Sequence, residues 1–269
     1  MDDAPVPASA WAVLRASTAA RIGLGRAGGS LPTKPLLDFQ LAHARARDAV
    51  HTPFDVAMLQ EAVAARGWPG VHVQSEARDR ATYLRRPDLG RRLDAPSRDR
   101  LAALDGGRCD VALVIADGLS TRATEKHALA VLDLTVGALV TWGWTVAPIA
   151  IAGQSRVALG DEIGALLQAR LVAVLIGERP GLSADDSLGI YLTHAPRIGR
   201  TDAERNCISN IRAGGLTYEQ AAHKLVYLMR ESRQAGLTGV ALKDESDRVP
   251  MLIPLHPRNE IPQNAPPQE

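Results

Sequence analysis

Three short apolar runs in the second half of the chain limit the possible folds more than any other feature. They occupy residues 110–116 (DVALVIA), 145–152 (TVAPIAIA) and 171–177 (LVAVLIG). Segments with helical spacing separate them, at 123–142 and 157–169. Strands that are apolar throughout are typical of a parallel sheet with helices on both faces. With right-handed crossovers, the runs predict a Rossmann-like unit of three parallel strands.

The segments on either side of these runs indicate three regions. Helical spacing at 36–50 and 55–66 predicts a mainly helical N-terminal region over residues 1–98. A Rossmann-like parallel-sheet domain follows over 99–247, and a Pro-rich tail, 248–269, is expected to be extended or disordered. The predicted fold class is therefore α/β, with the sheet domain preceded by helices.

Several shorter segments carry weaker patterns. We expect a short strand at 71–75, an extended arginine-rich loop at 83–94 and an amphipathic helix at 218–234. Apolar segments at 188–193 and 239–242 predict edge strands. Both edge strands would pair outside the three-stranded core of the sheet.

Composition excludes several classes of function. The 269 residues are 46% hydrophobic and carry a net charge of +1 with dispersed arginines, which gives no reason to expect nucleic acid. No apolar stretch reaches the roughly 18 residues of a membrane span, and the first residues lack a signal-peptide plan. Cys109 and Cys207 lie far apart, and the histidines form no metal-ligand pair. We therefore expect a soluble, cytoplasmic protein without a metal site.

A GxGxxG pattern is formed by Gly23, Gly25 and Gly28. A dinucleotide site needs this pattern between a strand and a helix, so that the helix N-terminus meets the pyrophosphate. Here the preceding segment, 11–22, has helical spacing, and GSLPTKP cannot begin a helix at once. The context favours a glycine-rich loop between two helices, in which Arg26 is a candidate anion contact.

Three loops follow the predicted strands, at 117–121, 153–157 and 177–182. Ligands of open α/β sheets bind outside the carboxyl ends of the strands, so these loops are expected at one shared edge. Asp117 suits either a bond to a ligand hydroxyl or the shaping of its own turn. Ser120 is suited to capping the helix that follows it.

Glu178 ends the third apolar run and precedes Arg-Pro-Gly, so a rigid turn is expected to hold it at the sheet edge. A carboxylate accepts hydrogen bonds and suits amide or hydroxyl donors on a ligand. An internal salt bridge to Arg179 or Arg156 is the alternative role.

Segment 201–211 is dense in short polar side chains and contains Cys207. Such a loop binds a ligand or pairs with its own backbone. His194 and His223 are distant in sequence, so no catalytic triad is indicated, and a lone cysteine is most often a small buried filler. The residues alone predict an α/β protein with a small-molecule or cofactor site at the sheet edge.

Longer strings of sequence resemble a known family. They are RIGLGRAGGSLPTKPLLDFQLAHARARDAVH, YLRRPDLGRRLD, VIADGLST, ALGDEIG, LIGERPGLSADDSLGIYLT and TDAERNCISNIRAGGL. In this order, from about residue 15 to 243, the chain resembles the small (light) subunit of ethanolamine ammonia-lyase. The length of these strings makes the likeness far more specific than the glycine pattern.

The resemblance implies a hetero-oligomer with a large TIM-barrel subunit that carries the ethanolamine site. Adenosylcobalamin would lie between the subunits and contact this chain at Val157, Glu178 and Cys207. Two of these positions, Val157 and Glu178, fall on the strand-end loops identified from topology. No catalytic residue is expected on this chain.

The resemblance also implies the chemistry. Homolysis of the cobalt–carbon bond gives an adenosyl radical, and ethanolamine becomes acetaldehyde and ammonia, while the protein holds and shields the cofactor. Glu178 would accept hydrogen bonds from corrin amides, Val157 would cover a ring edge, and Cys207 would pack as a soft contact. The chain has no DxHxxG motif, so cobalt is expected to keep its own dimethylbenzimidazole ligand.

Two other functions remain open at this point. An NAD-dependent oxidoreductase would rest on the glycine pattern, and a non-catalytic assembly subunit would hold the large chain without touching cofactor. Some family members carry a longer N-terminal extension that directs them into a bacterial microcompartment, whereas here only about ten residues precede the first predicted helix. The family association predicts the microcompartment, and the sequence alone predicts the cytoplasm.

Overall fold

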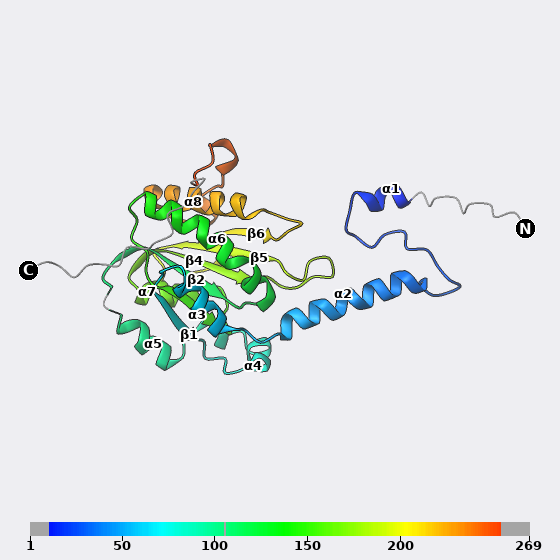
Figure 1. Cartoon of the computed structure of the whole chain (residues 1–269), viewed down its shortest axis with the longest axis horizontal. Helices are drawn as coiled ribbons and strands as arrows, with labels where there is room; N and C mark the ends of the chain where they lie inside the picture. Colours follow the sequence, from blue (N-terminus) through cyan, green and yellow to red (C-terminus); the bar gives the residue numbers. More distant parts are fainter. Residues whose placement is uncertain (1–10, 105, 254–269) are drawn as a thin grey trace, which may run out of the picture.

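The computed structural model describes residues 11–104 and 106–253 (Figure 1). Predictions for the first ten residues and for most of the Pro-rich segment 248–269 lie outside these residues. Within the described part, no helix is long and apolar enough to cross a membrane.

One mixed sheet forms the centre of the molecule, with the strand order β1-β3-β2-β4-β5-β6. The strands are β1 (Gly70–Gln74), β2 (Cys109–Ala116), β3 (Ile149–Gly153), β4 (Ala169–Gly177), β5 (Leu188–His194) and β6 (Arg205–Ile211). The first four strands in this order pair in parallel, whereas β5 and β6 are antiparallel to their neighbours. The three predicted apolar strands are β2, β3 and β4, which confirms the α/β fold class.

The helices lie on both faces of the sheet and in an N-terminal arm. They are α1 (Trp11–Ala16), α2 (Thr33–His51), α3 (Val56–Ala64), α4 (Arg80–Arg85), α5 (Ala95–Ala102), α6 (Thr121–Thr141), α7 (Leu159–Leu166) and α8 (Tyr218–Ala235). Short 3-10 helices are η1 (Leu89–Arg91), η2 (Asp202–Glu204), η3 (Gly239–Ala241) and η4 (Ser246–Arg248). The amphipathic helix predicted at 218–234 is confirmed as α8.

Burial of both sheet faces explains the unbroken apolar runs. Val111, Leu113 and Ile115 of β2 belong to a core with α3, α6 and α8. Ala112 and Val114 of the same strand belong to a second core with α5 and α7. Successive side chains of a strand point to opposite faces, so a strand covered on both sides has no solvent-facing positions for polar residues.

The N-terminal arm, α1 and α2, extends away from the sheet (Figure 1). Gly23, Gly25 and Gly28 lie between these two helices with φ angles of +58°, +79° and +63°. Left-handed angles of this kind favour glycine. A helix rather than a strand precedes the pattern, and α2 begins only at Thr33. The glycine-rich loop between two helices is therefore confirmed, and the context of a dinucleotide site is absent there.

The prediction of an extended loop at 83–94 is wrong, because this segment contains part of α4 and all of η1. The Asp79 carboxylate accepts a hydrogen bond from the backbone N–H of Thr82 at 2.8 Å and caps α4. Helix α4 ends shortly before Pro87, which cannot continue a helix.

The C-terminal edge of the sheet also differs from prediction. Segment 188–193 is a strand, β5, but it lies inside the sheet because residues 205–211 form β6 beside it rather than a polar loop. The strand predicted at 239–242 is instead η3. The Asn206 side chain binds the backbone of this segment: it accepts a hydrogen bond from the Gly239 N–H at 2.8 Å and donates one to the Leu242 carbonyl at 2.8 Å. These side-chain hydrogen bonds take the place of the strand-to-strand backbone hydrogen bonds that a β-strand would form.

The strand predicted at 71–75 is confirmed as β1, and it pairs with β3 in the central sheet. Residues 98 and 99 lie within α5. The division into a helical region, 1–98, and a sheet domain, 99–247, remains a prediction, and the sheet takes β1 from residues before that boundary.

Candidate functional site

Two neighbouring cavities lie at the carboxyl ends of the parallel strands. We call the first the edge cavity; its volume is about 410 Å³. It is lined by Tyr83, Gly118, Leu119, Arg156, Val157, Ile176, Gly177, Glu178, Arg179 and Tyr191. The second, the arginine groove, has a volume of about 810 Å³ and shares Arg156 and Val157 with the first. The groove is lined by Pro87, Asp88, Arg91, Arg92, Arg98, Arg156, Val157, Ala158, Asp161, Glu162, Ile198, Gly199, Arg200, Thr201, Asp202 and Arg205. This is the sheet edge at which the sequence predicts a ligand.

Glu178 follows β4 and lines the edge cavity. Its Oε2 atom accepts hydrogen bonds from the Ser187 hydroxyl at 2.5 Å and from the Asn210 backbone N–H at 3.4 Å. Among residues 11–104 and 106–253, its Oε1 atom has no hydrogen bond, and neither Arg179 nor Arg156 forms an ion pair with it. The internal salt bridge is therefore not observed, and one carboxylate oxygen is available to a ligand.

Val157 lies in the turn between β3 and α7 and is partly buried. Its carbonyl accepts a hydrogen bond from the Gly160 N–H at 3.0 Å, which closes a turn before α7. The helix predicted from residue 157 begins at Leu159. The side chain lines both cavities and packs against the core beneath α7. Val157 thus offers apolar surface where the two cavities meet.

Cys207 lies on β6 directly opposite Tyr191 of β5, which lines the edge cavity. Although the residue is exposed, partial burial of the thiol raises its pKa, a hydrogen bond with Tyr191 lowers it, and the Glu178 carboxylate raises it. A protonated thiol is a weak nucleophile. Cys207 is therefore exposed at the edge of the sheet, and the prediction that this lone cysteine is a buried filler is wrong.

Asp117 holds two strand-end loops together. Its side chain is 1% exposed and accepts from the backbone N–H groups of Gln154 at 2.9 Å and Ser155 at 2.8 Å. Burial raises the pKa of this carboxyl to about 6, whereas the Ser155 N–H and Arg80 lower it. Both oxygens are engaged, so of the two roles left open by the sequence the structure supports shaping of the turn.

Ser120 has the capping role predicted for it. Its hydroxyl accepts from the Ala123 N–H at 3.3 Å and donates to the Asp185 carbonyl at 2.8 Å. The second bond ties the start of α6 to the loop between β4 and β5. The cap therefore also fixes one side of the edge cavity.

A stack of Arg80, Tyr83 and Arg156, of which the last two line the edge cavity, was not predicted from the sequence. The Arg80 and Arg156 guanidinium carbons lie 4.8 Å and 4.2 Å from the centre of the fully buried Tyr83 ring. The Tyr83 hydroxyl donates to the Ser155 carbonyl at 3.0 Å, and burial raises its pKa. Cation–π contacts of this kind hold the arginines in place. Of the three residues only Tyr83 lies in the string YLRRPDLGRRLD, and no sequence pattern connects it with Arg80 and Arg156.

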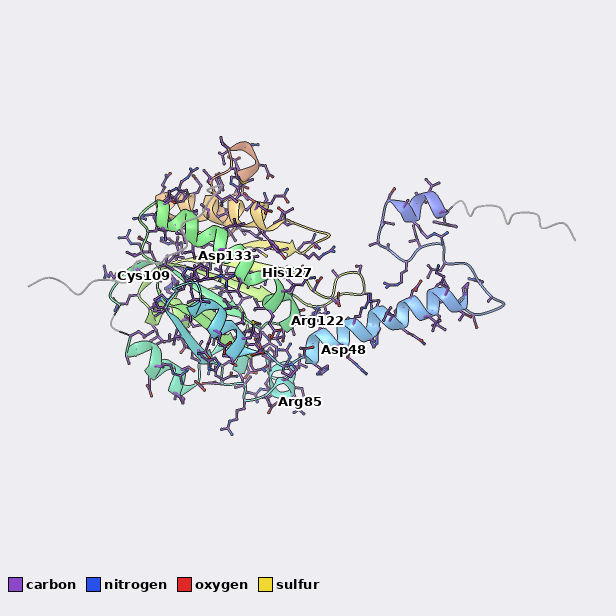
Figure 2. All side chains as sticks on the ribbon, viewed as in Figure 1. Asp48, Arg85, Cys109, Arg122, His127 and Asp133 are labelled. Atoms are coloured by element: carbon purple, nitrogen blue, oxygen red, sulfur yellow. The ribbon has the colours of Figure 1, made fainter. Side chains whose placement is uncertain are left out.

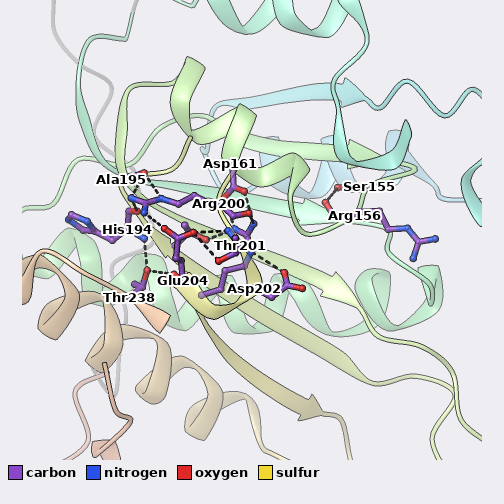
Figure 3. Close-up of polar contacts among 12 residues, drawn as sticks. Ser155, Arg156, Asp161, His194, Ala195, Arg200, Thr201, Asp202, Glu204 and Thr238 are labelled. Atoms are coloured by element: carbon purple, nitrogen blue, oxygen red, sulfur yellow. Dashed lines mark hydrogen bonds and ion pairs between the residues drawn. The ribbon is translucent and has the colours of Figure 1, made fainter. Parts of the chain in front are cut away.

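A buried ion pair connects α7 with β6 on the far side of the groove. Arg205 donates to both oxygens of Asp161, at 2.7 and 2.8 Å, and each side chain is 2% exposed. Figure 3 shows Asp161 beside the cluster formed by Arg200, Thr201 and Glu204. The pair fixes the relative position of the elements that carry Val157 and Cys207.

Another cavity, of about 210 Å³, lies at the opposite, amino-terminal ends of the strands, beside Cys109. Figure 2 labels Cys109 at this end and Arg122, in the first turn of α6, toward the other. Burial raises the pKa of the Cys109 thiol to about 11. Ligands of α/β sheets bind at carboxyl ends, so this cavity is not the candidate site.

Comparison with known proteins identifies the family. A family model described as ethanolamine ammonia-lyase light chain (EutC) matches residues 8–243. The chain belongs to this family. Proteins named ethanolamine ammonia-lyase small subunit are similar over most of their length. The protein from Xanthomonas campestris pv. campestris (strain ATCC 33913) is 58% identical over 249 residues, which cover 91% of each chain.

Two further members of the ethanolamine ammonia-lyase light chain family show the same extent of similarity. The protein from Azotobacter vinelandii is 56% identical over 91% of this chain and 92% of its own. The protein from Pseudomonas aeruginosa (strain PAO1) is 54% identical over 88% of each chain. The family match and these identities confirm the resemblance seen in the sequence strings. The matched residues, 8–243, include the lining of both cavities.

Proposed function

We propose that this chain is the small subunit of an adenosylcobalamin-dependent ethanolamine ammonia-lyase and forms one wall of the cofactor site. The observation that supports this most is the convergence of three separate segments at one edge of the sheet. Val157 and Glu178 line the same cavity, and Cys207 is paired with Tyr191, which lines it too. The family membership supports cobalamin as the ligand, and the convergence of these segments supports this cavity as the place where it would bind.

The lining of the edge cavity fits the rim of a corrin ring. Leu119, Val157 and Ile176 provide apolar surface, and Tyr191 provides an aromatic one. The free Oε1 atom of Glu178 is a charged acceptor, and corrin rings carry peripheral amides whose N–H groups donate. An apolar cavity with a few fixed polar groups is the usual form of a cofactor site.

The chain's own residues would bind and shield the cofactor. When bound, adenosylcobalamin supplies the radical chemistry that converts ethanolamine to acetaldehyde and ammonia. Glu178 would orient the ring through its amides, held in turn by Ser187 and the Asn210 backbone. Val157 would exclude water from a ring edge, and Cys207 would pack as a thiol.

The ethanolamine site and the catalytic residues would belong to a large TIM-barrel subunit. At the edge cavity, the Cys207 and Tyr191 pKa values are raised. Asp117 is occupied by backbone N–H groups. The Glu178 carboxylate, held by Ser187 and the Asn210 backbone, is assigned to binding the ring amides rather than to proton transfer. This chain is therefore expected to have no lyase activity by itself.

Exposed apolar residues on the N-terminal arm support an obligate partner. Leu37 and Leu41 of α2 are 56% and 52% exposed, and Trp11 of α1 is 51% exposed. Large exposed apolar patches mark protein interfaces. We assign this surface to the hetero-oligomer, and we extend the proposal to a bacterial microcompartment on the family association alone.

Reconstitution tests the proposed function. Lyase activity is expected only when this chain, the large subunit and adenosylcobalamin are combined. Glu178→Ala should weaken cobalamin binding to the complex by about tenfold or more, because a hydrogen bond to a charged group is lost. Glu61→Ala, an exposed carboxylate on α3, is the matched control. If Glu178→Ala assembles normally and leaves cobalamin affinity unchanged, the chain is an assembly subunit instead.

A further inference from the structure

The arginine groove has an excess of unpaired positive charge. Its acidic side chains all have arginine partners: Asp88 pairs with Arg86, Asp161 and Asp202 with Arg205, and Glu162 with Arg98. Arg91 and Arg92 also line the groove, and their exposed side chains have no hydrogen bond or ion pair within residues 11–104 and 106–253. The groove therefore offers cations without internal partners.

Arg156 lies where the groove meets the edge cavity and lines both. Its guanidinium stacks on Tyr83 at 4.2 Å, and Nη2 donates to the Tyr83 carbonyl at 3.2 Å. The Nε atom is buried without a hydrogen-bond partner in the described part of the chain. Figure 3 shows this side chain directed away from the Asp161 cluster. A guanidinium that is fixed, partly desolvated and incompletely bonded suits an anionic ligand.

We propose that the arginine groove binds the phosphodiester of the cofactor's nucleotide arm, with Arg156, Arg91 and Arg92 as its contacts. The inference rests on the proposed function, because it requires the corrin in the edge cavity. The phosphodiester is the anionic group of cobalamin, and its arm leaves the rim of the ring. An anion site is therefore needed beside the ring cavity rather than within it, and the shared position of Arg156 meets that requirement.

The chemistry of arginine fits this ligand. A planar guanidinium forms paired hydrogen bonds with phosphate oxygens, and bonds between charged partners are about twice as strong as neutral ones. Arg156 would make the fixed contact at the junction, while Arg91 and Arg92, which follow α4, would close on the phosphate from the groove. Glu178 would then bind the amide N–H donors of the corrin ring, and the arginines would bind the phosphodiester anion.

The test compares two probes on the complex of this chain with the large subunit. Cyanocobalamin carries the phosphodiester, whereas cobinamide lacks the whole nucleotide arm. The principal variant is the double substitution Arg91→Ala/Arg92→Ala, because both side chains are exposed and have no ion pair or hydrogen bond within the described part of the chain to lose. Arg156→Ala is the second variant, and Arg170→Ala, exposed at the start of β4, is the control.

Equilibrium dialysis, read by corrinoid absorbance, gives the dissociation constants. The double variant should raise the Kd for cyanocobalamin about tenfold and leave that for cobinamide unchanged. The difference in cyanocobalamin Kd between the double variant and the wild-type complex should become smaller at high salt, because salt screens the charges. Equal effects on both probes, or no effect on either, overturn the inference. Weaker association of the two subunits without any corrinoid would also overturn it, because the groove would then hold an acidic segment of the partner.

Failure of this inference is distinguishable from failure of the proposed function. Glu178→Ala should weaken both probes, because both carry the corrin amides. If Glu178→Ala weakens both and the arginine variants weaken neither, only the anion site is wrong. If the wild-type complex binds neither probe better than the large subunit alone does, the proposed function is wrong.

Discussion

Replacing Arg205 with Met would leave a buried carboxylate without its partner. In the native chain, Arg205 donates to Asp161 at 2.7 and 2.8 Å, and both side chains are 2% exposed. Methionine fills a similar volume without charge, so the substitution removes the ion pair with little loss of packing. The remaining Asp161 would lie between α7 and β6 without its bonded cation, and only the more weakly acting Arg200 charge would still lower its pKa.

The expected loss of unfolding free energy is about 3–5 kcal/mol, which is the usual cost of breaking a buried ion pair at one partner. Exposed pairs cost far less, so burial determines the magnitude here. Asp202 provides a matched control, because it also approaches Arg205, at 3.5 Å, but is 99% exposed. Asp202→Ala should cause no measurable loss of stability.

The loss should depend on pH in a defined direction. Burial already raises the pKa of Asp161, and Arg205 lowers it, so removing Arg205 raises that pKa further. A folded-state pKa above the unfolded value of about 3.9 means that the unfolded chain releases this proton first as pH rises. The unfolding free energy of the variant should therefore fall from about pH 4 upward, through the folded-state pKa.

Urea denaturation followed by circular dichroism measures both effects. The difference between Arg205→Met and the native chain should be larger at pH 7 than at pH 5. A loss below about 1 kcal/mol at pH 7, or a loss that is independent of pH, would refute the assignment of Asp161–Arg205 as a buried, charged pair.

Three further substitutions have expected outcomes in the same denaturation assay. Ser120→Ala removes the cap of α6 and should cost about 1 kcal/mol, and a change near zero would show that the cap is not used. Ile115→Ala opens a cavity beneath α6 and should cost about 2–5 kcal/mol, unlike a conservative Ile115→Val. Gly118 has a φ of +59°, and the Gly118→Ala substitution would place a Cβ atom 2.2 Å from the Gly177 carbonyl oxygen. Backbone strain alone should cost roughly 1–3 kcal/mol, and an unchanged stability would contradict the close approach of these loops.

The parallel core was predictable because its signal is local. Residues 110–116 are apolar at every position, and both faces of β2 are buried by helices from distant parts of the chain. The periodicity of 218–234 likewise predicted α8, since one helix face packs on the sheet and the other meets solvent. In both cases the pattern of apolar residues within the segment itself indicates which side chains are buried.

The antiparallel edge was not predictable in the same way. β6 carries Asn206, Cys207 and Asn210, which resemble loop residues because an edge strand exposes much of its surface. The segment at 239–242 has strand-like apolar residues, yet its backbone is bonded by the side chain of Asn206. Such a contact depends on a residue more than thirty positions away.

The candidate site was partly predictable. Topology placed Val157 and Glu178 at one edge, and the structure brings them to one cavity. The alternatives for Asp117 could not be separated from sequence, because its backbone donors at Gln154 and Ser155 belong to another loop. The stack of Arg80 and Arg156 on Tyr83 could not be predicted either, because it forms only when α4 packs beside the turn between β3 and α7.

The structure of the large–small complex with bound cobalamin tests the central claim most directly. We expect a corrin amide nitrogen within about 2.7–3.2 Å of Glu178 Oε1, Val157 against the ring edge, and Cys207 within van der Waals contact of the cofactor. A corrin enclosed entirely by the large subunit, with the edge cavity open to solvent, would contradict the account.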